Sequence, residues 1–237
     1  VESLMAQRAT AASHVVADPA ALEHARSAFR IWPRSGDAVA DLSPRLCVLV
    51  RTESQLEAAI AWHKAGAGCG LAMVYVDFRD ASDACRAVER CRSEGVPSGP
   101  ATRRILRAGE ERVLRALLES RPDAVLVRNP GSLSLCRQWA PGTVLVADAS
   151  LNAANELTVG VLAGWSVDRV TPAVELDGGR LAALAGRVPA ERLETVVYGR
   201  QAMFHMEHCL FASRLSGGRN GRDCGQPCRR HTLALDD

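Results

Sequence analysis

Short apolar runs that alternate with helix-like segments constrain the fold of this chain more than any other feature. The runs are LCVLVR, AMVYVD, AVLVR, TVLVAD, DRVTPAVE and ETVVYGR, and all lie between residues 46 and 200. Each is continuous rather than alternating, as is typical of parallel strands covered on both faces. The segments SQLEAAIAWHKAG, DACRAVERCRSEG, EERVLRALLESR and GRLAALAGRV have helical spacing between them, and some end at glycine, a common helix stop. The pattern predicts a parallel α/β domain.

A chain of 237 residues is long enough for one large barrel. Repeated alternation of strand and helix favours a TIM-barrel-like (β/α) barrel, closed or incomplete, over a doubly wound sheet. The sequence contains no Gly-x-Gly-x-x-Gly after the first run and no Walker-type Gly-Lys-Ser/Thr, so the usual nucleotide-binding forms of the open sheet lack support. We expect a helix and linker at 1–45, a barrel at 46–200 and a cysteine-rich segment at 201–237.

Composition bears on location and partners. No run approaches the roughly 20 apolar residues of a membrane span, and the start VESLMAQRAT does not resemble a secretory signal. These features predict a cytoplasmic protein without a membrane partner. The formal charge of +2 does not by itself indicate a polyanion, and an aromatic content of 4% offers few stacking platforms for single-stranded RNA. The chain begins at Val1 and ends soon after its last cysteine, so we expect it to be part of a longer protein.

Polar residues end several of the predicted strands. In a barrel, the loops at the C-terminal ends of the strands converge over the mouth and carry the chemistry. Arg51, Arg128 and Arg200 each end a run, and a guanidinium binds a carboxylate through two parallel hydrogen bonds. The three arginines are therefore candidates for binding an anionic substrate. Asp148 and Asn152 follow another run and could contact a second substrate, although this stretch could equally cap a helix.

Three of the eight cysteines share one late segment, which runs FHMEHCLFASRLSGGRNGRDCGQPCRRH. They are Cys209, Cys224 and Cys228, and glycines between them permit the thiols to converge. In a cytoplasmic chain such a group favours a metal or catalysis over disulfides. A zinc site could be completed by a nearby histidine, whereas an iron-sulfur cube usually takes four cysteines. Spacing alone leaves both metals open.

Motifs for proteolysis are weak. The chain has no Gly-x-Ser-x-Gly elbow, and HMEH from His205 to His208 lacks the His-Glu-x-x-His spacing of zinc peptidases. A nucleophile pair of Cys209 with His208 or His231 stays open, because such partners meet in space rather than in sequence.

The stretches DASLNAANELT, LVRTESQLEAA and DAVLVRNPGSL, with the HMEHC and DCGQPC portions of the late segment, resemble peptidase family U32, the collagenase-like proteases. The likeness runs from about residue 45 to the end. It implies a barrel-like protein and a 4Fe-4S cluster on Cys209, Cys224 and Cys228, with a fourth cysteine beyond this chain and zinc as the alternative metal. It also implies oxygen-independent hydroxylation of an RNA base or another aromatic acceptor, with prephenate as the oxygen donor.

Within that implied function, Asp148, His205 and His208 are the catalytic candidates, and Arg51, Arg128, Asn152 and Arg200 are the substrate-binding candidates. Two alternatives remain, a collagenase-like endopeptidase and a metal-stapled scaffold without activity.

Overall fold

The computed structural model describes residues 18–28, 43–66, 68, 70–200, 208–217 and 223–233. The chain forms two compact units, residues 1–197 and 198–237. We name them the α/β unit and the cysteine unit.

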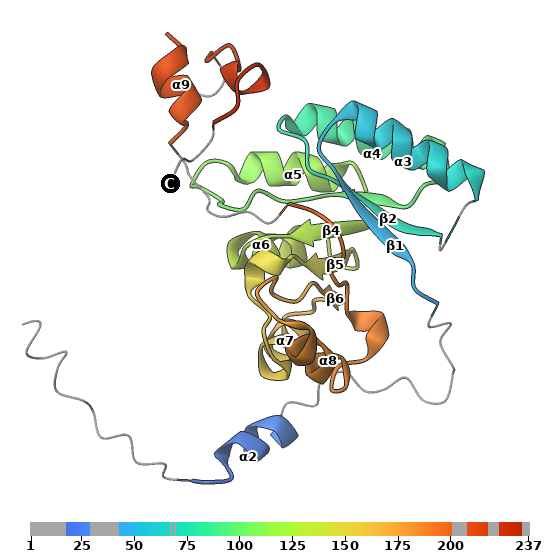
Figure 1. Cartoon of the computed structure of the whole chain (residues 1–237), viewed down its shortest axis with the longest axis vertical. Coiled ribbons are helices and arrows are strands. Elements are labelled where there is room, and N and C mark those ends of the chain that lie inside the picture. The colour runs from blue at the N-terminus through green and yellow to red at the C-terminus, as the bar shows by residue number, and fades with distance from the viewer. Residues whose placement is uncertain are drawn as a thin grey trace, which may run out of the picture. The chain divides into compact units, whose positions relative to one another are not determined.

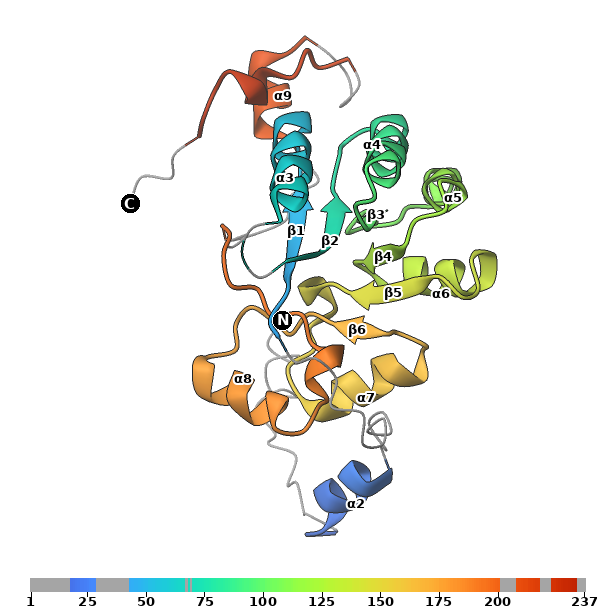
Figure 2. The ribbon, with the colours of Figure 1, turned by 90° about the vertical axis from the view of Figure 1, so that its right-hand side faces the viewer.

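The α/β unit is built on parallel strands (Figure 1). They are β1 (Leu46–Val50), β2 (Leu71–Val76), β3 (Ser98–Pro100), β4 (Ala124–Val127), β5 (Val144–Ala147) and β6 (Arg169–Val170). β1, β2 and β3 pair in sequence order, and so do β4, β5 and β6. A parallel bridge between Ala101 and Leu126 joins the two sets. Figure 2 shows the strands following one another around an arc, with helices on its outer side. The predicted parallel α/β class is thereby confirmed.

Helices connect the strands, and the loop after each strand starts the next helix. The helices are α3 (Glu53–Ala65), α4 (Ala81–Ser93), α5 (Glu111–Glu119), α6 (Pro130–Trp139), α7 (Glu156–Gly164) and α8 (Gly178–Ala185). Side chains of Thr52, Asp80, Asn129, Asn155 and Asp177 accept hydrogen bonds from backbone N–H groups in the first turns. These caps satisfy donors that a helix start leaves free. Polar residues after the strands thus fix where the helices begin.

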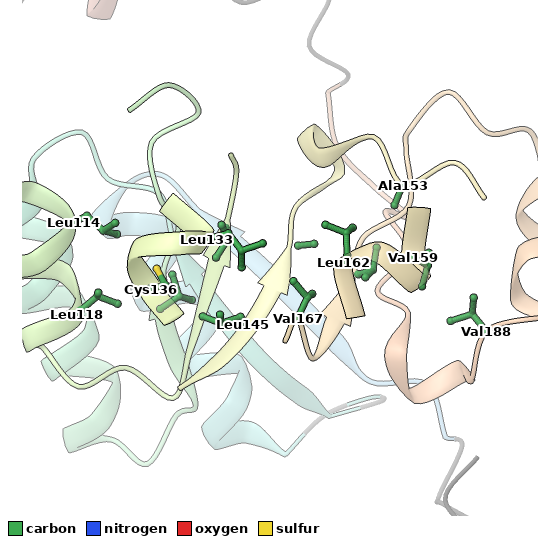
Figure 3. Packing of buried hydrophobic residues seen from close by; sticks show 14 of the residues in the cluster. Leu114, Leu118, Leu133, Cys136, Leu145, Ala153, Val159, Leu162, Val167 and Val188 are labelled. Carbon is green, nitrogen blue, oxygen red and sulfur yellow. The ribbon is translucent and has the colours of Figure 1, made fainter. Parts of the chain in front are cut away.

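Buried side chains form layers on both sides of the strands. On the outer side, one cluster packs β1 and β2 against α3 and α4, and a second packs β4, β5 and β6 against α5 to α8. Figure 3 shows Leu133 of α6, Leu145 of β5 and Leu162 of α7 in the second cluster. A smaller cluster on the inner side includes Met73 and Leu126. Burial on both faces explains why the strand sequences are continuously apolar.

The sequence pattern misses β3, because SGP contains no apolar run. Gly99 is required there by a close approach of the neighbouring strand: a Cβ on Gly99 would lie 1.6 Å from the carbonyl oxygen of Ala124. The pattern also misses α6 and α7. Both begin at an asparagine cap, and α6 has Pro130 in its first turn, a position that proline favours.

The described strands do not form a closed barrel, which was one of the two forms of the predicted (β/α) barrel. β1 pairs with β2 alone, and ETVVYGR does not form the predicted last strand. Only Leu193, just before that run, makes a parallel bridge, to Val170 of β6. Val197 is 81% exposed, so this segment lacks the burial that its apolar sequence suggested. The strands that the structure describes in the α/β unit therefore form an open arc.

The described part of the N-terminal region contains one helix, α2 (Ala21–Ala28). Two short 3-10 turns lie elsewhere in the unit, η1 (Ala149–Leu151) and η2 (Ala190–Arg192). Arg26 of α2 donates from Nε to Oε1 of Glu156, at the start of α7, over 2.8 Å. This ion pair fastens α2 to the α/β unit. The rest of the predicted helix and linker at 1–45 lies largely outside the described residues.

The cysteine unit contains α9 (Leu210–Leu215) and the short turn η3 (Pro227–Arg229), which contact each other. A hollow of about 470 Å³ in this unit is lined by Leu215, Asp223, Cys224, Pro227 and Arg230, among others. In the described ranges of both units, no helix combines the length and the apolar character needed to cross a bilayer.

Candidate functional site

Four charged side chains form what we call the charged rim. They lie at the C-terminal ends of β1, β2, β4 and β5. The members of the rim are Arg51, Asp77, Arg128 and Asp148. Each follows by two positions a residue of the inner cluster, namely Leu49, Tyr75, Leu126 or Val146. Successive side chains of a strand point to opposite faces, so residues two apart share a face. The sequence therefore places one charged layer just above the apolar interior of the arc.

Asp77 is the centre of the charged rim. Arg128 donates from Nη1 to Oδ1 of Asp77 over 2.8 Å and from Nη2 to Oδ2 over 3.0 Å. Arg51 donates from Nε to the same Oδ2 over 3.1 Å. On the other side, Nε of Arg128 lies 3.9 Å from Oδ2 of Asp148. One continuous chain of opposite charges thus links the ends of β1, β2, β4 and β5.

The two arginines differ in what they leave free. The Arg128 side chain is only 14% exposed, and its two Nη groups bind Asp77. The Arg51 side chain is 64% exposed and binds Asp77 through Nε alone. Among the described residues, the Nη groups of Arg51 have no hydrogen-bond partner. Arg51 is consequently the rim arginine with donors to spare for a ligand.

Asp77 stays ionised because of these neighbours. Burial by itself would raise the pKa of its carboxyl, but the hydrogen bonds and charges of Arg128 and Arg51 outweigh burial and hold the pKa below its usual value. Asp77 is therefore negatively charged at neutral pH and can hold both arginines.

Backbone contacts fix the base of the rim. The Arg128 N–H donates to Oγ1 of Thr102 over 3.0 Å, and the hydroxyl of Ser150 donates to the Arg128 carbonyl over 2.9 Å. Ser150 also donates its N–H to Oδ2 of Asp148 over 3.1 Å, so Asp148 caps η1 as well as facing Arg128. Helix capping, one of the two roles predicted for this stretch, thus occupies Oδ2 of Asp148. The other predicted role, contact with a substrate, stays a prediction.

The remaining predicted residues lie apart from the rim or outside the described residues. Asn152 is exposed beyond η1 and has a left-handed backbone, with φ of 54°. Arg200 belongs to the cysteine unit and is exposed. His208 is exposed two residues before the start of α9, and His205 lies outside the described residues. The structure thus brings together Arg51, Arg128 and Asp148 of the predicted set.

A second cluster of polar side chains lies within the interior of the arc, and it was not predicted from the sequence. The Tyr75 hydroxyl lies 2.9 Å from both carboxylate oxygens of Glu194. Arg169 Nε lies 2.7 Å from Oε1 of Glu194, an ion-pair distance with poor hydrogen-bond alignment. Burial, and then the charge of Glu194, raise the pKa of Tyr75, and the same two causes raise that of the Cys47 thiol to about 12. The available signal was the spacing: Tyr75 stands two residues before Asp77 on the same face.

The cysteine unit supplies the predicted metal ligands. Cys224 is buried, whereas Cys209 and Cys228 are exposed, and the Cys209 sulfur accepts a hydrogen bond from Ala212 N–H over 3.4 Å as the cap of α9. Within the described part of the chain, no three His, Cys, Asp or Glu side chains gather closely enough to hold a metal ion. Neither His208 nor His231 hydrogen-bonds the Cys209 thiol among these residues.

Two cysteines of the α/β unit behave as buried apolar residues. Cys91 and Cys136 are buried. Burial raises the pKa of Cys136 to about 12 and that of Cys91 as well. Such thiols stay protonated at neutral pH, which makes them poor metal ligands and nucleophiles. Cys69 lies outside the described residues.

A family model matches more than half of the chain. The family model described as Peptidase family U32 matches residues 106–234. A relative from Haemophilus influenzae named "tRNA hydroxylation protein P" is 31% identical over 121 residues, which are 49% of this chain and 25% of that protein. Its namesake from Escherichia coli strain K12 is 30% identical over 123 residues, 50% of this chain and 26% of that protein. The chain thus spans about a quarter of the length of these relatives.

A solved structure described as that of a U32 peptidase is also similar. The two chains are 14% identical, with a TM-score of 0.49 over 69% of this chain and 70% of the other.

Proposed function

The chain belongs to peptidase family U32, and from this premise we propose that the protein takes part in oxygen-independent hydroxylation of a tRNA base. The observation that carries the proposal is the similarity of about half of the chain to two proteins named for tRNA hydroxylation. The activity belongs to the longer protein of which this chain would be a part.

The distribution of charge supports an RNA partner. The cysteine unit, residues 198–237, contains six arginines and four acidic residues, so the whole formal charge of +2 lies in this unit and the α/β unit is neutral. Arg214, Arg230 and His231 are among its exposed residues. Clustered cations attract the phosphate backbone and release its counterions. The net positive charge of the chain therefore lies in the cysteine unit, which we call the basic module.

The charged rim supports an anionic donor. Arg51 has free guanidinium donors at the C-terminal ends of the strands, where parallel α/β proteins gather their ligand contacts. We propose that a carboxylate of a donor such as prephenate binds there. Asp148, whose side chain is 23% exposed at the same strand ends, is our candidate for positioning the acceptor or exchanging a proton with it. Arg128, Asn152, Arg200, His205 and His208 stay predicted participants.

The proposed cofactor is a 4Fe-4S cluster on Cys209, Cys224 and Cys228, with zinc as the alternative. The described arrangement does not gather these thiols into a ligand set. All three nevertheless lie in one small unit, and a fourth cysteine from the longer protein is part of the proposal. Anaerobic purification of the full-length protein with metal analysis tests it, and stoichiometric zinc without visible absorption would remove the cluster.

Nucleoside analysis tests the function itself. Mass spectrometry of tRNA from a wild-type and a deletion strain should show one hydroxylated nucleoside that is lost on deletion. The full-length gene should restore it. Arg51→Gln should fail to restore it, whereas Arg86→Gln, which alters an exposed ion pair on α4, should succeed. Identical nucleosides in both strains would refute the proposal. Cleavage of a denatured protein that disappears with Cys209→Ser would instead favour the peptidase.

Salt dependence tests the basic module. Binding of tRNA should weaken with salt, and replacing Arg214 and Arg230 by serine should reduce the slope of log K against log salt by about 1 to 2. Arg86→Ser on the α/β unit serves as the control, with no expected change. An unchanged slope in the double variant would exclude these arginines as phosphate contacts.

A further inference from the structure

We propose that the two Nη groups of Arg51 form a preformed fork for a ligand carboxylate, and that Asp77 is the positioning residue that holds this fork through Nε. The identity of the donor rests on the proposed function, whereas the fork and its support follow from the contacts of the charged rim. Asp77 was not among the predicted site residues.

The two arginines use their N–H donors differently. A guanidinium has five N–H donors in a fixed plane. Arg128 directs both Nη groups to Asp77 and its Nε toward Asp148, and the side chain is mostly buried. Arg51 donates to Asp77 from Nε only, and its side chain is mostly exposed. Arg128 is thus suited to anchoring Asp77, and Arg51 is suited to meeting a ligand.

Asp77 is a single carboxylate shared by two guanidinium groups, so the three side chains together carry one positive charge. Asp148 faces Arg128 rather than Arg51. With Asp148 included, the four side chains of the charged rim are neutral overall, and Arg51 carries the positive charge that is most exposed. A carboxylate matches both this charge and the spacing of two parallel N–H donors, which a lysine ammonium would not reproduce.

A free arginine side chain has many rotamers, and fixing it when a ligand arrives weakens binding. In this structure Oδ2 of Asp77 already holds the guanidinium at 3.1 Å through Nε, the nitrogen that a carboxylate bound to the Nη pair does not need. The negative charge of Asp77 is offset by the two arginines that it contacts. Asp77 should accordingly strengthen binding rather than repel the ligand.

Calorimetric titration of the full-length protein tests the fork, with prephenate and inorganic phosphate as the two probes. Arg51→Lys keeps the charge and loses the fork, and we expect it to weaken binding by about tenfold or more. Arg86→Lys alters an exposed arginine paired with Asp83 on α4 and should bind as the wild type does. Wild-type affinity in Arg51→Lys would overturn the fork.

A double-mutant cycle tests the role of Asp77. Asp77→Asn should weaken binding by about tenfold when Arg51 is present and should have almost no further effect in the Arg51→Gln background. Additive losses would show that Asp77 does not act through Arg51. Asp77→Asn leaves the buried Arg128 without its partner, so its folding is checked by circular dichroism. If it does not fold, Asp77→Glu takes its place, with weaker binding expected only where Arg51 is present.

Failure of the donor and failure of the fork give different results. Binding of phosphate without binding of prephenate would remove prephenate as the donor while preserving the fork. If neither probe binds the wild-type protein, the fork itself is refuted.

Discussion

Replacing Gly99 with alanine should separate the two halves of the parallel strand array. The new Cβ would lie 1.6 Å from the carbonyl oxygen of Ala124 on β4. Contacts below 3.0 Å essentially never occur for real Cβ atoms, and the opposing atom belongs to the backbone, which cannot swing aside as a side chain can. β3 and β4 must therefore move apart by more than an ångström.

The size of the effect follows from the hydrogen bonds across this junction. Asp123 N–H donates to the Ser98 carbonyl over 2.9 Å, and Thr102 N–H donates to the Leu126 carbonyl, also over 2.9 Å. A shift of more than an ångström stretches both beyond hydrogen-bond range. Each bond contributes about 1 kcal/mol net, and a buried group left without a partner costs about 1–3 kcal/mol. We expect a loss of roughly 3 kcal/mol in the free energy of unfolding.

The same substitution should disturb the charged rim. Asp77 follows β2 on one side of the junction, and Arg128 follows β4 on the other. Their paired hydrogen bonds at 2.8 and 3.0 Å depend on the distance between these strands. Ligand binding at Arg51 should weaken together with stability.

Urea unfolding followed by circular dichroism measures the loss. Gly164→Ala, at the end of α7, is the matched control, because its added Cβ would meet nothing within 4 Å. The control should change stability by no more than about 1 kcal/mol, in the stabilising direction. A Gly99→Ala protein as stable as the wild type would show that the close approach of β3 and β4 has been misjudged.

Three further outcomes follow from buried groups. Asp77→Asn should cost about 3 kcal/mol at neutral pH. Because the folded pKa is lowered despite burial, the difference should begin to shrink near the unfolded pKa of about 4 and disappear only when the pH falls below the lowered folded pKa. Thermal melts showing a constant difference across this acid range would contradict this. Tyr75→Phe should cost about 2 kcal/mol in urea unfolding, since the hydroxyl binds a carboxylate, and an unchanged midpoint would assign no net stability to the contact. Iodoacetamide at pH 8 should label the exposed Cys228 and spare Cys136, whose pKa is raised by burial to about 12; equal labelling by peptide mass mapping would contradict the burial.

The sequence by itself determined the elements whose causes are local. Valine-rich runs marked β1, β2, β4 and β5, because strands buried on both faces need apolar side chains at every position. Helical spacing marked α3, α4, α5 and α8 in the same way. Polar residues after the runs were recognised as candidates for a site, and the two-residue period of a strand would have indicated their shared face.

Only the tertiary structure decided what depends on neighbours distant in the chain. β3 is a strand because Ala124 and Val74 lie on either side of it, not because SGP favours one. The run after Leu193 contains apolar residues, but among the described residues its pairing with β6 stops at Glu194, and so it does not extend the array. Propensity describes a residue alone, whereas a strand exists only when its backbone groups find partners.

The roles within the charged rim were decided in the same way. Sequence presented Arg51 and Arg128 as equivalent strand-end cations. Folding distinguishes them, because the half-buried Arg128 donates to Asp77 from both Nη groups and the exposed Arg51 donates from Nε alone. The type of charge at each strand end is written in the sequence, but the partner of each charge is set by which strands the fold brings together.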